Sequence, residues 1–135
     1  MIGFVVSTIP ELSMVVDLAC RHRCKPFNDI LFGIPVCQSK LEVIQQLKSK
    51  LTSAMGDDCS VHVLVDHPSQ IDFLENFIRN NGQSADKDAE RWTVFLKLDT
   101  GYHRAGITCD LAGVELAAKI IESSFLALQG VYSHW

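Results

Sequence analysis

The stretch that decides the fold is Trp92–Ile107, which reads WTVFLKLDTGYHRAGI. It begins as an apolar run and becomes polar within a few residues, which predicts a buried β-strand that emerges at its carboxyl end. Alternation gives this strand one uniformly apolar face for packing against helices and a second face that ends charged. The first face holds Val94, Leu96 and Leu98, and the second holds Phe95, Lys97 and Asp99. Such an end is typical of a binding site in a parallel sheet, although a strand that merely enters a solvated loop gives the same pattern.

The rest of the chain alternates strand-like and helix-like segments. Besides the Trp92 strand, β-strands are expected at Ile2–Val6, Asp29–Ile34, Val61–Asp66 and Leu128–His134. Helix starts are predicted at the capping boxes Thr8–Glu11 and Ser39–Glu42, at Ser69 with Asp72, and at Leu111. The last helix is expected to end at Phe125 and to offer Val114, Leu116, Ala117, Ile120 and Ile121 for burial. The polar run Asn80–Glu90 is the best loop candidate.

This alternation predicts an α/β protein with parallel strands and right-handed crossovers. Two architectures fit the pattern. One is an open, doubly wound sheet, and the other is part of a (β/α)8 barrel, which normally needs about 250 residues. The pattern alone favours the open sheet, because 135 residues cannot close an eight-stranded barrel.

Composition sets limits on the class of protein. The net charge of −4, without clusters of basic and aromatic residues, argues against a nucleic-acid partner. No apolar run reaches the roughly 18–20 residues that cross a bilayer, and the start lacks the features of a secretory signal. We therefore expect one cytoplasmic domain over residues 1–135, with reduced thiols. Cys20 and Cys24 suggest a zinc site, but no second ligand pair follows and two arginines lie between them, so no metal is expected.

The segment KLDTGYHRAG resembles the K-x-D-x-G-x-x-R-x-G motif of the alanine racemase-like barrel enzymes, which use pyridoxal phosphate. It is most similar to the D-serine dehydratase and D-threonine aldolase branch. The segments VVSTIPE, DILFGIPV, VHVLVDHPSQ and GVYSHW agree with that branch in order and spacing. The resemblance implies a partial TIM-type (β/α)8 barrel of about five parallel βα units, matching its second to sixth strands.

The resemblance also implies a cofactor site. Arg104 matches the motif arginine beside the phenolic oxygen of pyridoxal phosphate, and His134 matches a histidine that packs against the pyridine ring. Lys97 matches a lysine that is carbamylated in some relatives and steadies the arginine, and Asp99 completes the cofactor-binding set. If this reading is correct, Arg104 faces a mouth formed by Asp66, Asp99 and His134. The remaining histidines, His62, His67 and His103, are expected to be structural or exposed.

The chain lacks other parts that the resembled family uses. No R-P-H-x-K-T-H-K motif, which carries the Schiff-base lysine, occurs in the sequence, so no catalytic residue is assigned. Neither the late phosphate-binding loops nor the His/Cys zinc site of the D-serine dehydratase branch has a counterpart. We therefore expect a fragment of a pyridoxal phosphate-dependent D-amino-acid lyase that is inactive as an isolated chain, and a homodimer in the longer enzyme. The alternative is a non-catalytic pseudo-enzyme or a partner-binding α/β domain, and dehydration, aldol cleavage and racemisation all stay open.

Overall fold

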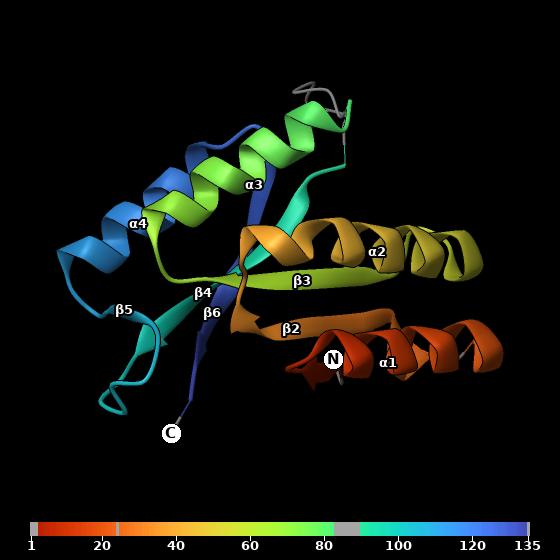
Figure 1. Cartoon of the computed structure of the whole chain (residues 1–135). Helices are drawn as coiled ribbons and strands as arrows, with labels where there is room; N and C mark the ends of the chain where they lie inside the picture. The colour runs from red at the N-terminus through yellow and green to blue at the C-terminus, as the bar shows by residue number, and fades with distance from the viewer. Residues whose placement is uncertain (1–2, 24, 83–89, 135) are drawn as a thin grey trace.

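The computed structural model describes residues 3–23, 25–82 and 90–134. Strands and helices alternate along this part of the chain (Figure 1). The strands are β1 (Phe4–Val6), β2 (Asp29–Pro35), β3 (Ser60–Val65), β4 (Trp92–Asp99), β5 (Ile107–Thr108) and β6 (Leu126–Ser133). The α-helices are α1 (Ile9–His22), α2 (Leu41–Met55), α3 (Pro68–Asn80) and α4 (Leu111–Glu122), and short 3-10 turns lie at Lys25–Asn28 (η1) and Gln38–Lys40 (η2). Cys24 and most of the predicted Asn80–Glu90 loop lie outside the described residues.

Apart from the two-residue β5, the described strands form one parallel sheet in the order of the sequence, β1-β2-β3-β4-β6. A single row of paired residues crosses the whole sheet: Val6, Phe32, Val63, Val94 and Leu128. Each pairing is parallel, so the carboxyl ends of all these strands lie on the same side. Side chains at those ends therefore meet at one edge.

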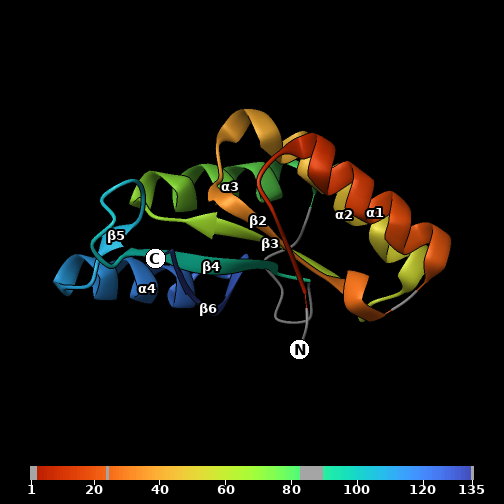
Figure 2. The same cartoon turned by 90° about the horizontal axis from the view of Figure 1, so that it is seen from below.

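All four helices cover the same face of this sheet, and Figures 1 and 2 show them following its curve. One core contains the alternate strand residues that share the row above together with the buried faces of the helices. The helices contribute Leu12 and Val16, Ile44 and Leu51, Ile71 and Leu74, and Leu116 and Ile120. A doubly wound sheet has helices on both faces and a reversal of strand order, whereas a barrel has neither. The partial barrel is confirmed, and the open doubly wound sheet is wrong.

A short strand, β5, was not predicted. Its two residues pair with Leu98 and Asp99 on the edge of β4 that β3 also uses, because β6 occupies the opposite edge. The turn into β5 passes so close to β4 that a Cβ at Gly106 would lie 2.5 Å from the Asp99 nitrogen. Gly106 also has φ 121°, and its N–H donates to Asp66 Oδ2 at 3.0 Å. Only glycine satisfies both conditions at this position.

The predicted helix starts are right for α1 and wrong for α2 and α3. Thr8 Oγ1 accepts from the Glu11 N–H, and the Glu11 carboxylate accepts from the Thr8 N–H, as a capping box requires. Ser39 does not cap α2, because η2 precedes the helix and Lys40 holds the N-cap position without a side-chain bond. In α3 the cap is His67 rather than Ser69: its Nδ1 accepts from the Ser69 N–H at 3.2 Å.

Helix α4 is shorter than predicted and exposes part of its apolar surface. It ends at Glu122 rather than Phe125, because Ser123 has extended backbone angles and its hydroxyl donates to Glu75 Oε1 at 2.6 Å. Leu116 and Ile120 are buried as expected, and Ala117 is half-buried. Val114 and Ile121 are exposed, which corrects the prediction for both. Apolar residues occur on several sides of this helix, so the sheet buries one stripe and leaves another in solvent.

Candidate functional site

The carboxyl ends of β4 and β6 bring the four predicted cofactor-binding residues together. Lys97 pairs with Tyr132 in the sheet register and Leu98 pairs with Ser133, so the ends of these strands lie side by side. A small cavity of about 10 Å³ lies at this edge, lined by Lys97, Leu98, Asp99, Tyr102, Arg104, Ala105 and His134. The motif residues and the histidine therefore share one site, although they come from two strands and the loop after β4.

Asp99 organises the loop that follows β4. One carboxylate oxygen accepts from the N–H groups of Gly101 and His103 at 3.0 Å each, and the other lies 2.9 Å from His103 Nδ1. The backbone N–H of His103, the N–H of Gly101 and the His103 ring together lower the pKa of Asp99 from 3.8 to about 2. Gly101 (φ 118°) and His103 (φ 55°) both have positive φ, which turns the chain back over the strand end. The next residue, Arg104, is thereby held above the site.

Arg104 and His134 both contact the ring of Tyr102, a residue that the sequence did not assign to the site. The guanidinium carbon of Arg104 is 5.2 Å from the centroid of the Tyr102 ring. The His134 ring meets the same tyrosine edge-on, with centroids 5.9 Å apart and an interplanar angle of 89°. All three side chains are exposed at the edge of the sheet. Tyr102 lies between two residues with positive φ, Gly101 and His103, and no periodicity in the sequence signals its role.

Lys97 is the buried cation of the site. Its side chain is buried, and its Nζ lies 5.3 Å from the centroid of the Tyr132 ring on β6. The face of an aromatic ring attracts a cation that lies over it, and this stabilises the positive charge where water does not reach. The loop is tied to β6 above it, since Thr100 Oγ1 and Ser133 Oγ are 2.6 Å apart. Lys97 lies over Tyr132 and Arg104 over Tyr102, and both cations line the same cavity.

The other candidate residues are not among the side chains that line this cavity. Asp66, expected at the mouth, lies at the end of β3 and accepts the Gly106 N–H described above. His62 is buried on the sheet face opposite the helices, and its Nε2 is 2.6 Å from Asp29 Oδ1. His67 caps α3, and the side chain of His103 is 82% exposed beside Asp99. These three histidines are therefore structural or exposed.

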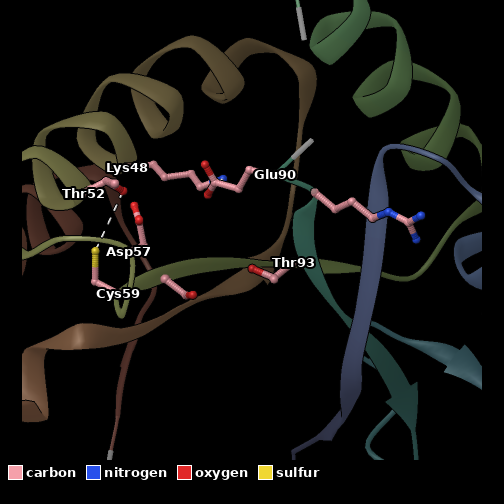
Figure 3. Close-up of a pocket in the computed structure, with 8 residues that line it drawn as sticks. Lys48, Thr52, Asp57, Cys59, Glu90 and Thr93 are labelled. Carbon is pink, nitrogen blue, oxygen red and sulfur yellow. Dashed lines mark hydrogen bonds and ion pairs between the residues drawn. The ribbon is translucent and has the colours of Figure 1, made fainter. Parts of the chain in front are cut away.

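A larger pocket of about 360 Å³ lies near the opposite ends of the strands (Figure 3). Figure 3 shows Lys48 of α2 and Glu90, which precedes β4, reaching toward each other, and their charged atoms are 2.9 Å apart. Lys48 is buried and also lies over the Trp92 ring, at 5.4 Å from its centroid. Burial raises the pKa of the Cys59 thiol, whose Sγ donates to the Gly56 carbonyl at 3.0 Å. The contacts of Lys48 hold α2 against the sheet. The raised pKa keeps the Cys59 thiol protonated, and a protonated thiol is a poor nucleophile.

The described residues offer neither a metal site nor a membrane-spanning helix. Among them, no group of three or more His, Cys, Asp or Glu side chains is arranged to hold a metal ion, and Cys24 of the considered Cys20–Cys24 pair lies outside them. In the same part of the chain, the helices are too short or too polar to cross a membrane. The cytoplasmic location stays a prediction.

Comparison with known proteins relates the whole chain to one group of barrels. The D-serine dehydratase of Schizosaccharomyces pombe is 31% identical over 132 residues, which is 96% of this chain and 28% of that protein. The D-serine dehydratase of Dictyostelium discoideum is 30% identical over 138 residues, or 98% of this chain and 30% of that protein. The chain thus spans less than a third of the length of these relatives.

Solved structures show the same fold at lower identity. D-threonine aldolase from Filomicrobium marinum superposes with a TM-score of 0.70 at 20% identity, over 94% of this chain and 29% of that one. D-threo-3-hydroxyaspartate dehydratase from Delftia sp. HT23 gives a TM-score of 0.64 at 21% identity, over 96% of this chain and 29% of that one. The family model described as "Alanine racemase, N-terminal domain" matches residues 32–135. Because that match covers most of the sequence, the chain belongs to the alanine racemase N-terminal domain family, as the K-x-D-x-G-x-x-R-x-G segment predicts.

Proposed function

We propose that this chain forms part of the pyridoxal phosphate site of a D-amino-acid lyase of the D-serine dehydratase or D-threonine aldolase type. The observation that carries the proposal is the gathering of Arg104, His134 and Lys97 at the carboxyl ends of β4 and β6. Ligands of parallel α/β folds bind at this edge. Similarity to two D-serine dehydratases, and in fold to a D-threonine aldolase, supports the same conclusion.

The donor set suits this cofactor. Pyridoxal phosphate offers an anionic phenolic oxygen and a flat heteroaromatic ring. The Arg104 guanidinium would pair with the oxygen, and the His134 imidazole would pack against the ring. Lys97 would add a buried positive charge to the same site, which would favour the anionic form of the oxygen. Asp99 would act indirectly, by holding the loop that carries Arg104.

The chemistry would then divide between the cofactor and the chain. When bound, pyridoxal phosphate supplies an electron sink for a reaction at Cα of an amino acid, here a small D-amino acid. The residues of this chain would bind and orient the ring and hold the charge on its phenolic oxygen. The motif that carries the covalent lysine in the resembled family is not among the 135 residues. The inactivity of the isolated chain therefore stays a prediction.

The test is the substitution Arg104→Ala in the longest in-frame product that carries an R-P-H-x-K-T-H-K motif. We expect cofactor retention to fall about tenfold or more, since a hydrogen bond to a charged group contributes about 1.5–3 kcal/mol. Bound cofactor would be measured by visible absorbance after gel filtration. Arg21→Ala is the matched control, because Arg21 is an exposed arginine in the last turn of α1.

Equal, small losses in the two variants would remove Arg104 from the site. They would favour the alternative in which the chain is a non-catalytic α/β domain.

A further inference from the structure

The Tyr102 ring stands where an aromatic ligand of this site would stand. Arg104 lies over its face at 5.2 Å, and His134 meets its edge with centroids 5.9 Å apart. These are the two residues that, under the proposed function, hold the phenolic oxygen and the ring of pyridoxal phosphate. The guanidinium and the imidazole are therefore already in contact with a six-membered aromatic ring, and that ring belongs to the protein itself.

The space beside these residues is too small for a second ring. The cavity measures about 10 Å³, which is close to the minimum for one water molecule. A cavity that accepts benzene is about 150 Å³. A ring that takes the contacts of Tyr102 with both Arg104 and His134 therefore needs the Tyr102 side chain to move.

Among the described lining residues, Tyr102 is the side chain best able to leave. Lys97 and Leu98 belong to β4 and are paired with β6 on one side. Asp99 is fixed by three hydrogen bonds to its own loop. Tyr102 is 60% exposed, and the contacts that hold its ring are weak ones to Arg104 and His134. It can rotate into solvent without breaking a hydrogen bond that the structure records.

We propose that Tyr102 is a place-holder that occupies the aromatic contacts of Arg104 and His134, and that it rotates into solvent when another aromatic ring enters the site. This inference rests on the proposed function, since it takes the entering ring to be a pyridoxal-type ring. The place-holder competes with the ligand, so removing it should tighten binding. A tyrosine that instead packed on the bound ring would have the opposite effect. The sign of the change therefore decides the role.

The probe is 4-deoxypyridoxine 5′-phosphate, a ring analogue without the aldehyde, whose binding needs no covalent lysine. Its dissociation constant would be measured by the fluorescence anisotropy of the pyridine ring, for the full chain and for Tyr102→Ala and Tyr102→Phe. We expect Tyr102→Ala to bind about three- to tenfold more tightly, the scale of the two lost ring contacts. Tyr102→Phe keeps the ring and should bind like the unsubstituted chain. Unchanged or weaker binding by Tyr102→Ala would overturn the place-holder.

A second measurement needs no probe and tests whether the Tyr102 ring contacts His134 in the free chain. In the NMR spectrum of the free chain, the His134 ring protons should carry a ring-current shift that persists in Tyr102→Phe and disappears in Tyr102→Ala. An amide spectrum that otherwise matches the unsubstituted chain shows that Tyr102→Ala is folded. The absence of this shift in the free chain would also overturn the place-holder.

Arg104→Ala separates this inference from the proposed function. If Arg104→Ala weakens probe binding but Tyr102→Ala does not strengthen it, the cofactor site stands and the place-holder fails. If Tyr102→Ala strengthens binding and Arg104→Ala has no effect, the place-holder stands and the role of Arg104 fails. If the probe binds none of the variants, both are overturned.

Discussion

At the scale of single residues, Asp99 has the strongest electrostatic signature of the site. Two backbone N–H groups and the His103 ring lower its pKa to about 2. Because folding lowers the pKa of Asp99, the ionised carboxylate contributes fully to the stability of the loop at pH values above 3.8, the ordinary pKa of the group. That contribution is lost as the pH falls from 3.8 through about 2. We expect the Asp99 carboxyl carbon to titrate near pH 2 when followed by NMR.

The substitution His103→Ala separates the causes of this pKa shift. It removes the ring nitrogen, 2.9 Å from Asp99 Oδ2, and leaves both backbone N–H donors in place. The pKa of Asp99 should therefore rise only part of the way toward 3.8. Titration near 3.8 in the unsubstituted chain would show that the loop does not hold the carboxylate.

The composition of the site could be predicted only in part. A buried strand that ends in charge, together with the motif, predicted Lys97, Asp99 and Arg104 at one edge, and the family resemblance added His134. The contacts of the Tyr102 ring with Arg104 and His134 are made in a loop with positive φ at Gly101 and His103, which no spacing of residues encodes. Local backbone conformation, rather than periodicity, decides this part of the site.

At the scale of elements, the two capping motifs offer a matched test. Thr8 caps α1 through a real capping box, whereas Ser39 belongs to η2 and makes no cap to α2. We expect Thr8→Ala to lower the free energy of unfolding by about 1 kcal/mol, because it leaves an N–H donor of the first turn unpaired. Ser39→Ala should change it by less than about 0.5 kcal/mol. Urea denaturation measures both, and equal losses would restore Ser39 as a cap.

The same elements show what periodicity can reveal. The long strands lie where apolar runs predicted them, within two residues at the ends that the structure describes. Strand β5 has two residues, too few to give a pattern, and it forms because Gly106 can approach β4 and bond to Asp66. For α4, apolar residues at Val114 and Ile121 fitted burial, but the sheet can bury only one stripe of a helix. Tertiary contacts decided both cases.

At the scale of the whole molecule, the described sheet has two lateral edges. β1 pairs with β2 alone, and β6 pairs with β4 alone. Strands with an unpaired edge expose N–H and C=O groups that can pair with another chain. Apolar side chains accompany both edges, since Val5 is 55% exposed and Val131 is 62% exposed. This association would be distinct from the homodimer expected for the longer enzyme, which stays a prediction.

We therefore expect the 135-residue chain to self-associate as its concentration rises, and Val131→Lys to oppose this. Val131 of β6 lines an apolar groove of about 380 Å³ together with Val114 and Ala117 of α4. A charge at that edge should weaken association about tenfold, or about 1.4 kcal/mol, in sedimentation velocity runs at several concentrations. Val43→Lys on α2 is the control, because it adds the same charge at an exposed valine away from both edges. Equal effects of the two lysines would indicate a general influence of net charge, and a chain that stays monomeric at NMR concentrations would show that the edges do not pair.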